Sequence, residues 1–251
     1  MALESDQDRM TVIEHLDELR RRILVALAAL LIAVVIAFVE YHRIFEIIKR
    51  PLQATGVKEL VTFSPSEPFM TVLKVSIYAG IMLALPVILY EFWAFMMPAL
   101  YERERKAVIP YVLLTAGLFI GGVVFCYYLV LPVGLKWLIG FGGDIFNQQL
   151  RAGEYVGFVT MFLLAFGVTF ELPIVLLILD SIGVVNYRML RRYRRYAIVI
   201  IAVVAMVLTP SQDPVSMLLM MGPLLLLYEF SLVMTRLAER RRARRRALAV
   251  E

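Results

Sequence analysis

Residues 23–39 read ILVALAALLIAVVIAFV, a run without one charged or polar side chain. A helix that crosses a bilayer needs about 20 apolar residues, because each residue rises about 1.5 Å and the hydrocarbon core is about 30 Å thick. Three further long apolar runs follow at residues 69–95, 108–133 and 155–179. Two shorter runs lie at residues 197–208 and 215–228. The sequence therefore predicts an all-α integral membrane protein with six transmembrane helices.

The composition agrees with a chain that is embedded in lipid. Apolar residues make up 61% of the sequence and the mean hydropathy is +0.79, whereas soluble domains are about 45–50% apolar. The formal net charge is +5, but the basic residues lie in short loops beside apolar runs, where they set the orientation of a membrane protein. We therefore expect no nucleic-acid partner.

Lys and Arg are concentrated on the side of the bundle that holds both termini. The side with both termini carries clusters at residues 20–22, 103–106, 188–195 and 236–246, and the opposite side carries few basic residues. Because positively charged loops stay in the cytoplasm, we expect a multi-pass protein of the cytoplasmic (inner) membrane with both termini cytoplasmic. The membrane domain is expected over residues 1–236, followed by a basic cytoplasmic tail, residues 237–251, that lies near anionic lipid.

The fifth apolar run, residues 197–208, is shorter than the membrane core. A helix of that length spans about 18–20 Å, so the sequence predicts a bilayer that is thinned beside the last two helices. The alternative is that Tyr193 and Tyr196 extend this helix into the interface.

Several carboxylates lie on the cytoplasmic side, although acidic residues contribute little to topology. Glu14 forms a capping box with Thr11 at the start of a helix. Glu18 follows on the same helix, and it either pairs with Arg22 four residues later or faces a cationic ligand. The loop after the second run adds Glu91, Glu102 and Glu104 among aromatic residues. A carboxylate beside an aromatic ring suits a guanidinium, which donates two parallel hydrogen bonds and stacks on the ring.

Glu171 is a single carboxylate inside the fourth run, two residues before Pro173. A charge there costs about 2.5–3.5 kcal/mol on insertion scales, so we expect Glu171 to face a polar cavity or a partner, or to make an interhelical hydrogen bond. On the other side of the membrane, Ser64 and Glu67 are expected to cap the second transmembrane helix.

The remaining reactive residues predict neither an enzyme nor a metal site. The chain has one cysteine, Cys126, inside an apolar run, and its two histidines lie outside the runs. No nucleophile and base, pair of facing aspartates or metal-ligand set is evident in the predicted helices. We expect no cofactor.

Six segments, in order along nearly the whole chain, resemble the TatC family, the receptor subunit of the twin-arginine protein translocase. They are HLDELRRR at residues 15–22, SPSEPF at 64–69, LPVILYEFWAFMMPALYERER at 85–105, FGVTFELP at 166–173, LTPSQDP at 208–214 and PLLLLYE at 223–229. The resemblance implies a concave helical bundle that binds twin-arginine signal peptides and exports folded proteins using the proton gradient. It also implies single-span TatA- and TatB-type partners and association of several copies of this chain.

The same resemblance assigns roles to individual residues. The residues implied in signal-peptide binding are Glu18, Arg20, Phe95, Glu104 and Arg105. Glu171 falls on the polar position of the fourth span, and the functionally sensitive positions outside the membrane are Pro51, Phe69 and Asp213. Met217 stands where a polar residue is expected, so the partner of Asp213 is left open.

A proton-coupled secondary transporter that uses Glu171 is the alternative function. Such a transporter needs several polar groups at the membrane midplane and broken helices, and many have internal repeats. Here Glu171 with Pro173 is a single instance, and no repeat is evident.

Overall fold

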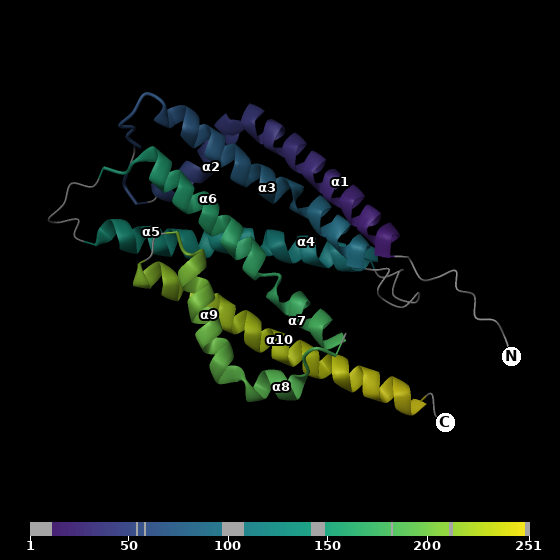
Figure 1. Cartoon of the computed structure of the whole chain (residues 1–251). Coiled ribbons are helices and arrows are strands. Elements are labelled where there is room, and N and C mark those ends of the chain that lie inside the picture. Colours follow the sequence, from purple (N-terminus) through teal and green to yellow (C-terminus); the bar gives the residue numbers. More distant parts are fainter. Residues whose placement is uncertain are drawn as a thin grey trace.

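The chain folds into a bundle of helices in a computed structural model, which describes residues 12–53, 55–57, 59–96, 108–141, 149–181, 183–210 and 213–248. The helices are α1 Val12–Val39, α2 Tyr41–Gln53, α3 Glu67–Met96, α4 Val108–Phe125, α5 Leu131–Gly140, α6 Ala152–Thr169, α7 Leu172–Ser181, α8 Tyr187–Arg192, α9 Arg194–Leu208 and α10 Pro214–Leu248. A π-helical segment, η4 Cys126–Val130, joins α4 to α5. In Figure 1, α1 and α3 lie side by side at one edge of the bundle, and α8, α9 and α10 lie at the other.

Five stretches of helix are long and apolar enough to cross a membrane: Glu14–Val39, Glu67–Phe95, Val112–Gly140, Ala152–Ser181 and Pro214–Arg240. The fifth predicted span corresponds to α9, which has 15 residues and rises about 22 Å. Tyr196 lies in the first turn of α9, so the helix does extend beyond the apolar run as the alternative reading of the sequence proposed. The last helix, α10, continues to Leu248 through the residues predicted as a basic tail.

Prolines explain two irregular points within the spans. The fourth span is divided into α6 and α7 at Phe170 and Glu171, and Glu171 lies two residues before Pro173. The third span contains the π-helical turn η4, which ends directly before Leu131 and Pro132. Proline has no backbone N–H, and its ring collides with the carbonyl four residues earlier, so the regular hydrogen-bond ladder is interrupted at both points.

Small residues allow α1 to approach α3 closely. Ala33, Ala37 and Ala84 are buried in this contact, and a Cβ added to Gly80 would lie only 2.8 Å from the backbone N and Cα of Val34. Close backbone approach through small side chains is the usual way in which helices associate in lipid. The outer face of α1 remains uncovered, since only 11% of its most apolar window is buried.

The apolar core lies around α6, which packs against α3 and α4. Its fully buried side chains include Val156, Val159, Phe162 and Phe166. The same cluster continues through the third and last spans, with Leu131, Met220 and Leu224. This core packs the third, fourth and last spans against one another.

Candidate functional site

An arginine joins two carboxylates where α1 packs against the last turns of α3. Arg22 donates from Nε to Glu18 Oε1 at 3.0 Å and from Nη2 to the same oxygen at 2.5 Å. Its Nη1 donates to Glu91 Oε2 at 3.0 Å. The two acidic side chains are 18% and 15% exposed. The predicted ion pair between Glu18 and Arg22 is therefore present, and it extends to Glu91 on the neighbouring helix.

Phe95 lies against the same end of α1. Its ring stacks on the imidazole of His15, with 4.5 Å between the ring centroids and 18° between the planes. This contact joins two segments that the sequence analysis assigned to one site, residues 15–22 and residues 85–105. The role of His15 was not predicted, because stacking across two helices depends on how the helices are rotated.

One other predicted residue of this site does not join the cluster. Arg20 is exposed and lines a shallow hollow with Asp17, Arg21 and Leu24. Glu104 and Arg105 lie outside the described residues, as does Thr11 of the predicted capping box. The helix that this box was expected to start is present and begins at Val12.

Glu171 lies at the break between α6 and α7. Its backbone carbonyl accepts from the amides of Ile174 and Val175, which start the new helix after the break. Its side-chain Oε1 is buried and has no hydrogen-bond partner among the described residues. The interhelical hydrogen bond considered for this residue is not found there, and the prediction that Glu171 faces a polar partner stays a prediction.

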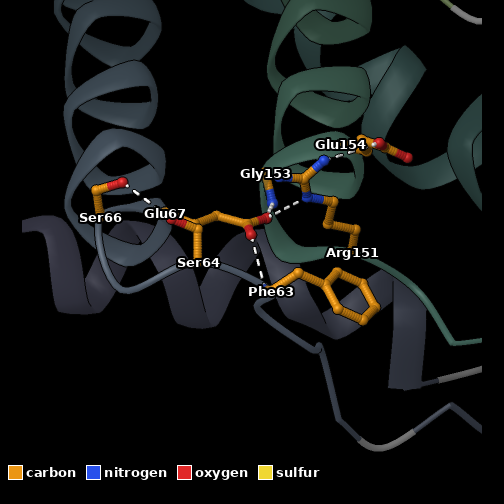
Figure 2. A network of polar contacts seen from close by, with 7 residues as sticks. All are labelled: Phe63, Ser64, Ser66, Glu67, Arg151, Gly153 and Glu154. Atoms are coloured by element: carbon orange, nitrogen blue, oxygen red, sulfur yellow. Dashed lines mark hydrogen bonds and ion pairs between the residues drawn. The ribbon is translucent and has the colours of Figure 1, made fainter.

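A second polar cluster ties the loop between α2 and α3 to the start of α6 (Figure 2). Glu67, which is 8% exposed, accepts from Arg151 Nε at 2.8 Å, from the Phe63 amide at 2.9 Å and from the Gly153 amide at 3.4 Å. The carboxylate raises the pKa of Arg151 above its ordinary value. Among the described residues, the Glu67 side chain accepts from no amide of α3, so the predicted cap by Glu67 is not found. The Ser64 hydroxyl bonds to Ser66 at 3.1 Å.

Pro51, Phe69 and Asp213, the three further positions that the family resemblance singled out, differ in their burial and in their contacts. Pro51 is buried inside α2, and the carbonyl four residues before it, that of Ile47, accepts from the Tyr127 hydroxyl at 2.8 Å. Phe69 is 57% exposed. Asp213 accepts from the amides of Val215 and Ser216 at 3.0 and 2.7 Å, so it caps α10 with backbone partners despite the apolar Met217.

A hollow of about 1170 Å³ lies between α3, α5 and α6, beside the contacts of Glu67 with Arg151. Its polar lining includes Glu67, Lys74, Tyr78 and Arg151. Lys74 is an exposed cation within the second span, and the sequence analysis missed it because one lysine hardly lowers the hydropathy of a long run. Among the described residues, no group of three or more His, Cys, Asp or Glu is placed to hold a metal ion.

Comparisons with known proteins agree on one family. The family model described as "Sec-independent protein translocase protein (TatC)" matches residues 14–223. The chain is 42% identical to the TatC protein of Aquifex aeolicus over 93% of this chain and 98% of that protein. It is 38% identical to the TatC protein of Carboxydothermus hydrogenoformans, over 89% of this chain and 91% of that protein.

The fold agrees as well. A crystal structure described as the twin arginine translocase receptor TatC superposes with a TM-score of 0.81 at 42% identity, covering 90% of this chain and 100% of that one. The expected six-span all-α fold is thereby confirmed, and nothing in the comparisons supports the transporter alternative. The chain belongs to the TatC family of Sec-independent protein translocase proteins.

Proposed function

We propose that this protein is the signal-peptide receptor of a twin-arginine translocase, which binds peptides with two consecutive arginines and takes part in the export of folded proteins. Support comes from relatives that are named as translocase proteins and from the likeness to a solved twin-arginine receptor. The local chemistry also supports it, because carboxylates held beside aromatic rings suit guanidinium groups.

The contact between His15 and Phe95 carries this proposal. Their rings stack at 4.5 Å and bring the two candidate binding segments together beside Glu18. The proposed contacts with the signal peptide are Glu18, Arg20 and Phe95, with Glu104 and Arg105 from the segment that follows α3. Replacing the ligand arginines by lysine should weaken binding, since an ammonium group cannot form the planar two-point contact of a guanidinium.

The proposed partner subunits would bind apolar helix surfaces that remain exposed in the bundle. The lipid-facing side of α1 exposes Leu24, Leu31, Val35 and Val39, and single-span helices of the TatA and TatB type could pack there or on α9. Copies of this chain are proposed to associate in the complex. Arginines near α8 and along α10 favour a cytoplasmic location for both termini in the inner membrane, beside anionic lipid. The proton gradient is the proposed source of energy.

A photocrosslinking amino acid at Phe95 tests the receptor function. Membranes with the full complex are offered a twin-arginine signal peptide or its twin-lysine version. We expect crosslinks to the arginine peptide only, and none from Phe92, which is 53% exposed on the same helix. Glu18→Gln should abolish the crosslink, whereas Asp17→Asn, an equal change of charge at an exposed neighbour, should preserve it. Equal crosslinking to both peptides, or from both positions, would contradict the proposal.

A further inference from the structure

The hollow between α3, α5 and α6 combines a polar end with apolar walls. Its volume of about 1170 Å³ is slightly above the range for small-ligand pockets, about 300–1,000 Å³. Where α3 and α6 begin, the lining is polar and includes Ser64, Ser66 and Arg151. Along α5 and α6 the lining is apolar and includes Leu135 and Phe158. A ligand with a charged head group and hydrocarbon chains matches both parts.

Lys74 lines this hollow without a carboxylate partner. It is exposed on α3, within the stretch Glu67–Phe95 that is apolar enough to cross a membrane. Lysine inside a transmembrane helix is costly unless it faces a cavity or a partner. Among the described residues, Lys74 makes no ion pair. The hollow therefore presents a positive charge that an anionic ligand can neutralise.

The two carboxylates that line the hollow are engaged elsewhere. Glu67 accepts from Arg151 and from two backbone amides. Glu154 lies 3.7 Å from Arg151 and is 78% exposed. Lys74 follows Glu67 by seven residues, which is about 10 Å along the helix axis. Both acidic groups of the lining thus contact Arg151, and the counter-ion of Lys74 has to come from a ligand.

The position of Lys74 on its helix suits a phosphate group. Side chains of an α-helix lean toward its N-terminus, so Lys74 leans toward the end of the hollow that holds the serines and Arg151. Tyr78, four residues later, lies on the same face and adds a phenolic hydroxyl to the lining. Ammonium and hydroxyl groups donate to phosphate oxygens, and basic pockets between transmembrane helices bind lipid head groups.

We propose that this hollow binds one phospholipid, whose phosphate accepts from Lys74 and whose acyl chains lie against the apolar walls of α5 and α6. The lipid belongs to the leaflet at the end of the bundle where α3 begins. Glu91 and Phe95 of the candidate receptor site lie at the opposite end of α3, so the lipid site does not depend on the proposed receptor function.

Native mass spectrometry of the full-length protein tests the site, after removal of lipid in detergent and titration with defined ligands. The ligands are a short-chain phosphatidylglycerol, the diacylglycerol with the same chains but no phosphate, and glycerol phosphate without chains. We expect the wild type to bind the first ligand and neither of the others. Lys74→Gln should weaken this binding about tenfold, the effect of about one charge-assisted hydrogen bond, and Lys74→Arg should preserve it.

Lys136 provides the matched control. It is an exposed lysine within the third span, on α5, and it does not line the hollow. Lys136→Gln removes the same charge as Lys74→Gln and should bind phosphatidylglycerol as the wild type does. Melting curves of both variants show whether the fold is retained.

The other outcomes would overturn the lipid site. Equal effects of Lys74→Gln and Lys136→Gln, or no effect of either, would mean that the hollow contributes nothing specific. Equal binding of diacylglycerol would remove the role of the phosphate, and equal binding of glycerol phosphate would remove that of the chains. Unchanged lipid binding in Lys74→Gln with reduced recovery of partner subunits would assign the hollow to a protein helix. Loss confined to Lys74→Gln, with normal melting and with binding retained in Lys74→Arg, supports the proposal.

Discussion

Substitution of Gly80 by alanine should weaken the packing of α1 against α3. A Cβ at this position would lie 2.8 Å from the backbone N and Cα of Val34, whereas carbon atoms in favourable contact are about 3.5–4.0 Å apart. The backbones must therefore separate by about 1 Å, or the contact remains strained. Overpacking of this kind costs about 1–3 kcal/mol.

Gly117 provides a matched control on α4. It is exposed, and a Cβ added there would meet nothing within 4 Å. Both substitutions gain the preference of alanine over glycine in a helix, about 0.5–1 kcal/mol, so their difference isolates the contact with Val34. A loss of 1 kcal/mol lowers the melting temperature by about 2–4 °C in a protein of about this size. Gly80→Ala should thus melt about 2–12 °C below Gly117→Ala.

The chain carries its own probe for this measurement. Cys126 is its single cysteine and is fully buried, so a thiol-reactive dye labels the detergent-solubilised protein only as it unfolds. Melting curves of the wild type and both variants would be recorded in the same detergent. If Gly80→Ala melts together with Gly117→Ala or above it, the inferred close packing of α1 on α3 is wrong.

Three further predictions concern polar contacts. Asp213→Ala should destabilise the protein by about 0.5–2 kcal/mol through loss of the cap on α10, with Asp213→Asn close to wild type in the same melting assay. Glu67→Ala should speed tryptic cleavage after Arg151, because the contacts to the loop between α2 and α3 are lost. Glu154→Ala is the control, because it removes a carboxylate that is 78% exposed and 3.7 Å from Arg151. This substitution should not speed the cleavage. Glu229→Ala should cost less than about 1 kcal/mol, because its ion pair is solvent-accessible, and a larger loss would contradict this.

The spans could be predicted from the sequence because hydropathy depends only on local composition. The apolar runs predicted all six spans, and Pro173 indicated the break in the fourth span. The length of α9 was underestimated because the run was ended before Tyr196, an amphipathic side chain that fits the interface as well as the helix. The orientation expected from Lys and Arg also rests on local composition, and it stays a prediction.

The contacts within the candidate sites could not be predicted in the same way. Arg22 and Glu91 are 69 residues apart, and Glu67 and Arg151 are 84 residues apart. Whether such residues meet depends on the rotation of each helix about its axis and on the depth at which it packs, and neither quantity is encoded in a local pattern. The pairing of Glu18 with Arg22 was predictable because both lie on one helix, four residues apart.

The buried proline of α2 has a consequence for how substitutions combine. Pro51 removes the amide that would otherwise bond to the Ile47 carbonyl, and the Tyr127 hydroxyl binds that carbonyl instead. Pro51→Ala would supply a competing donor, after which loss of the tyrosine hydroxyl should matter less than it does in the wild type. The two positions are therefore epistatic. Natural variants that lose the proline can lose the tyrosine at little further cost, whereas variants that lose the hydroxyl first leave a carbonyl unpaired.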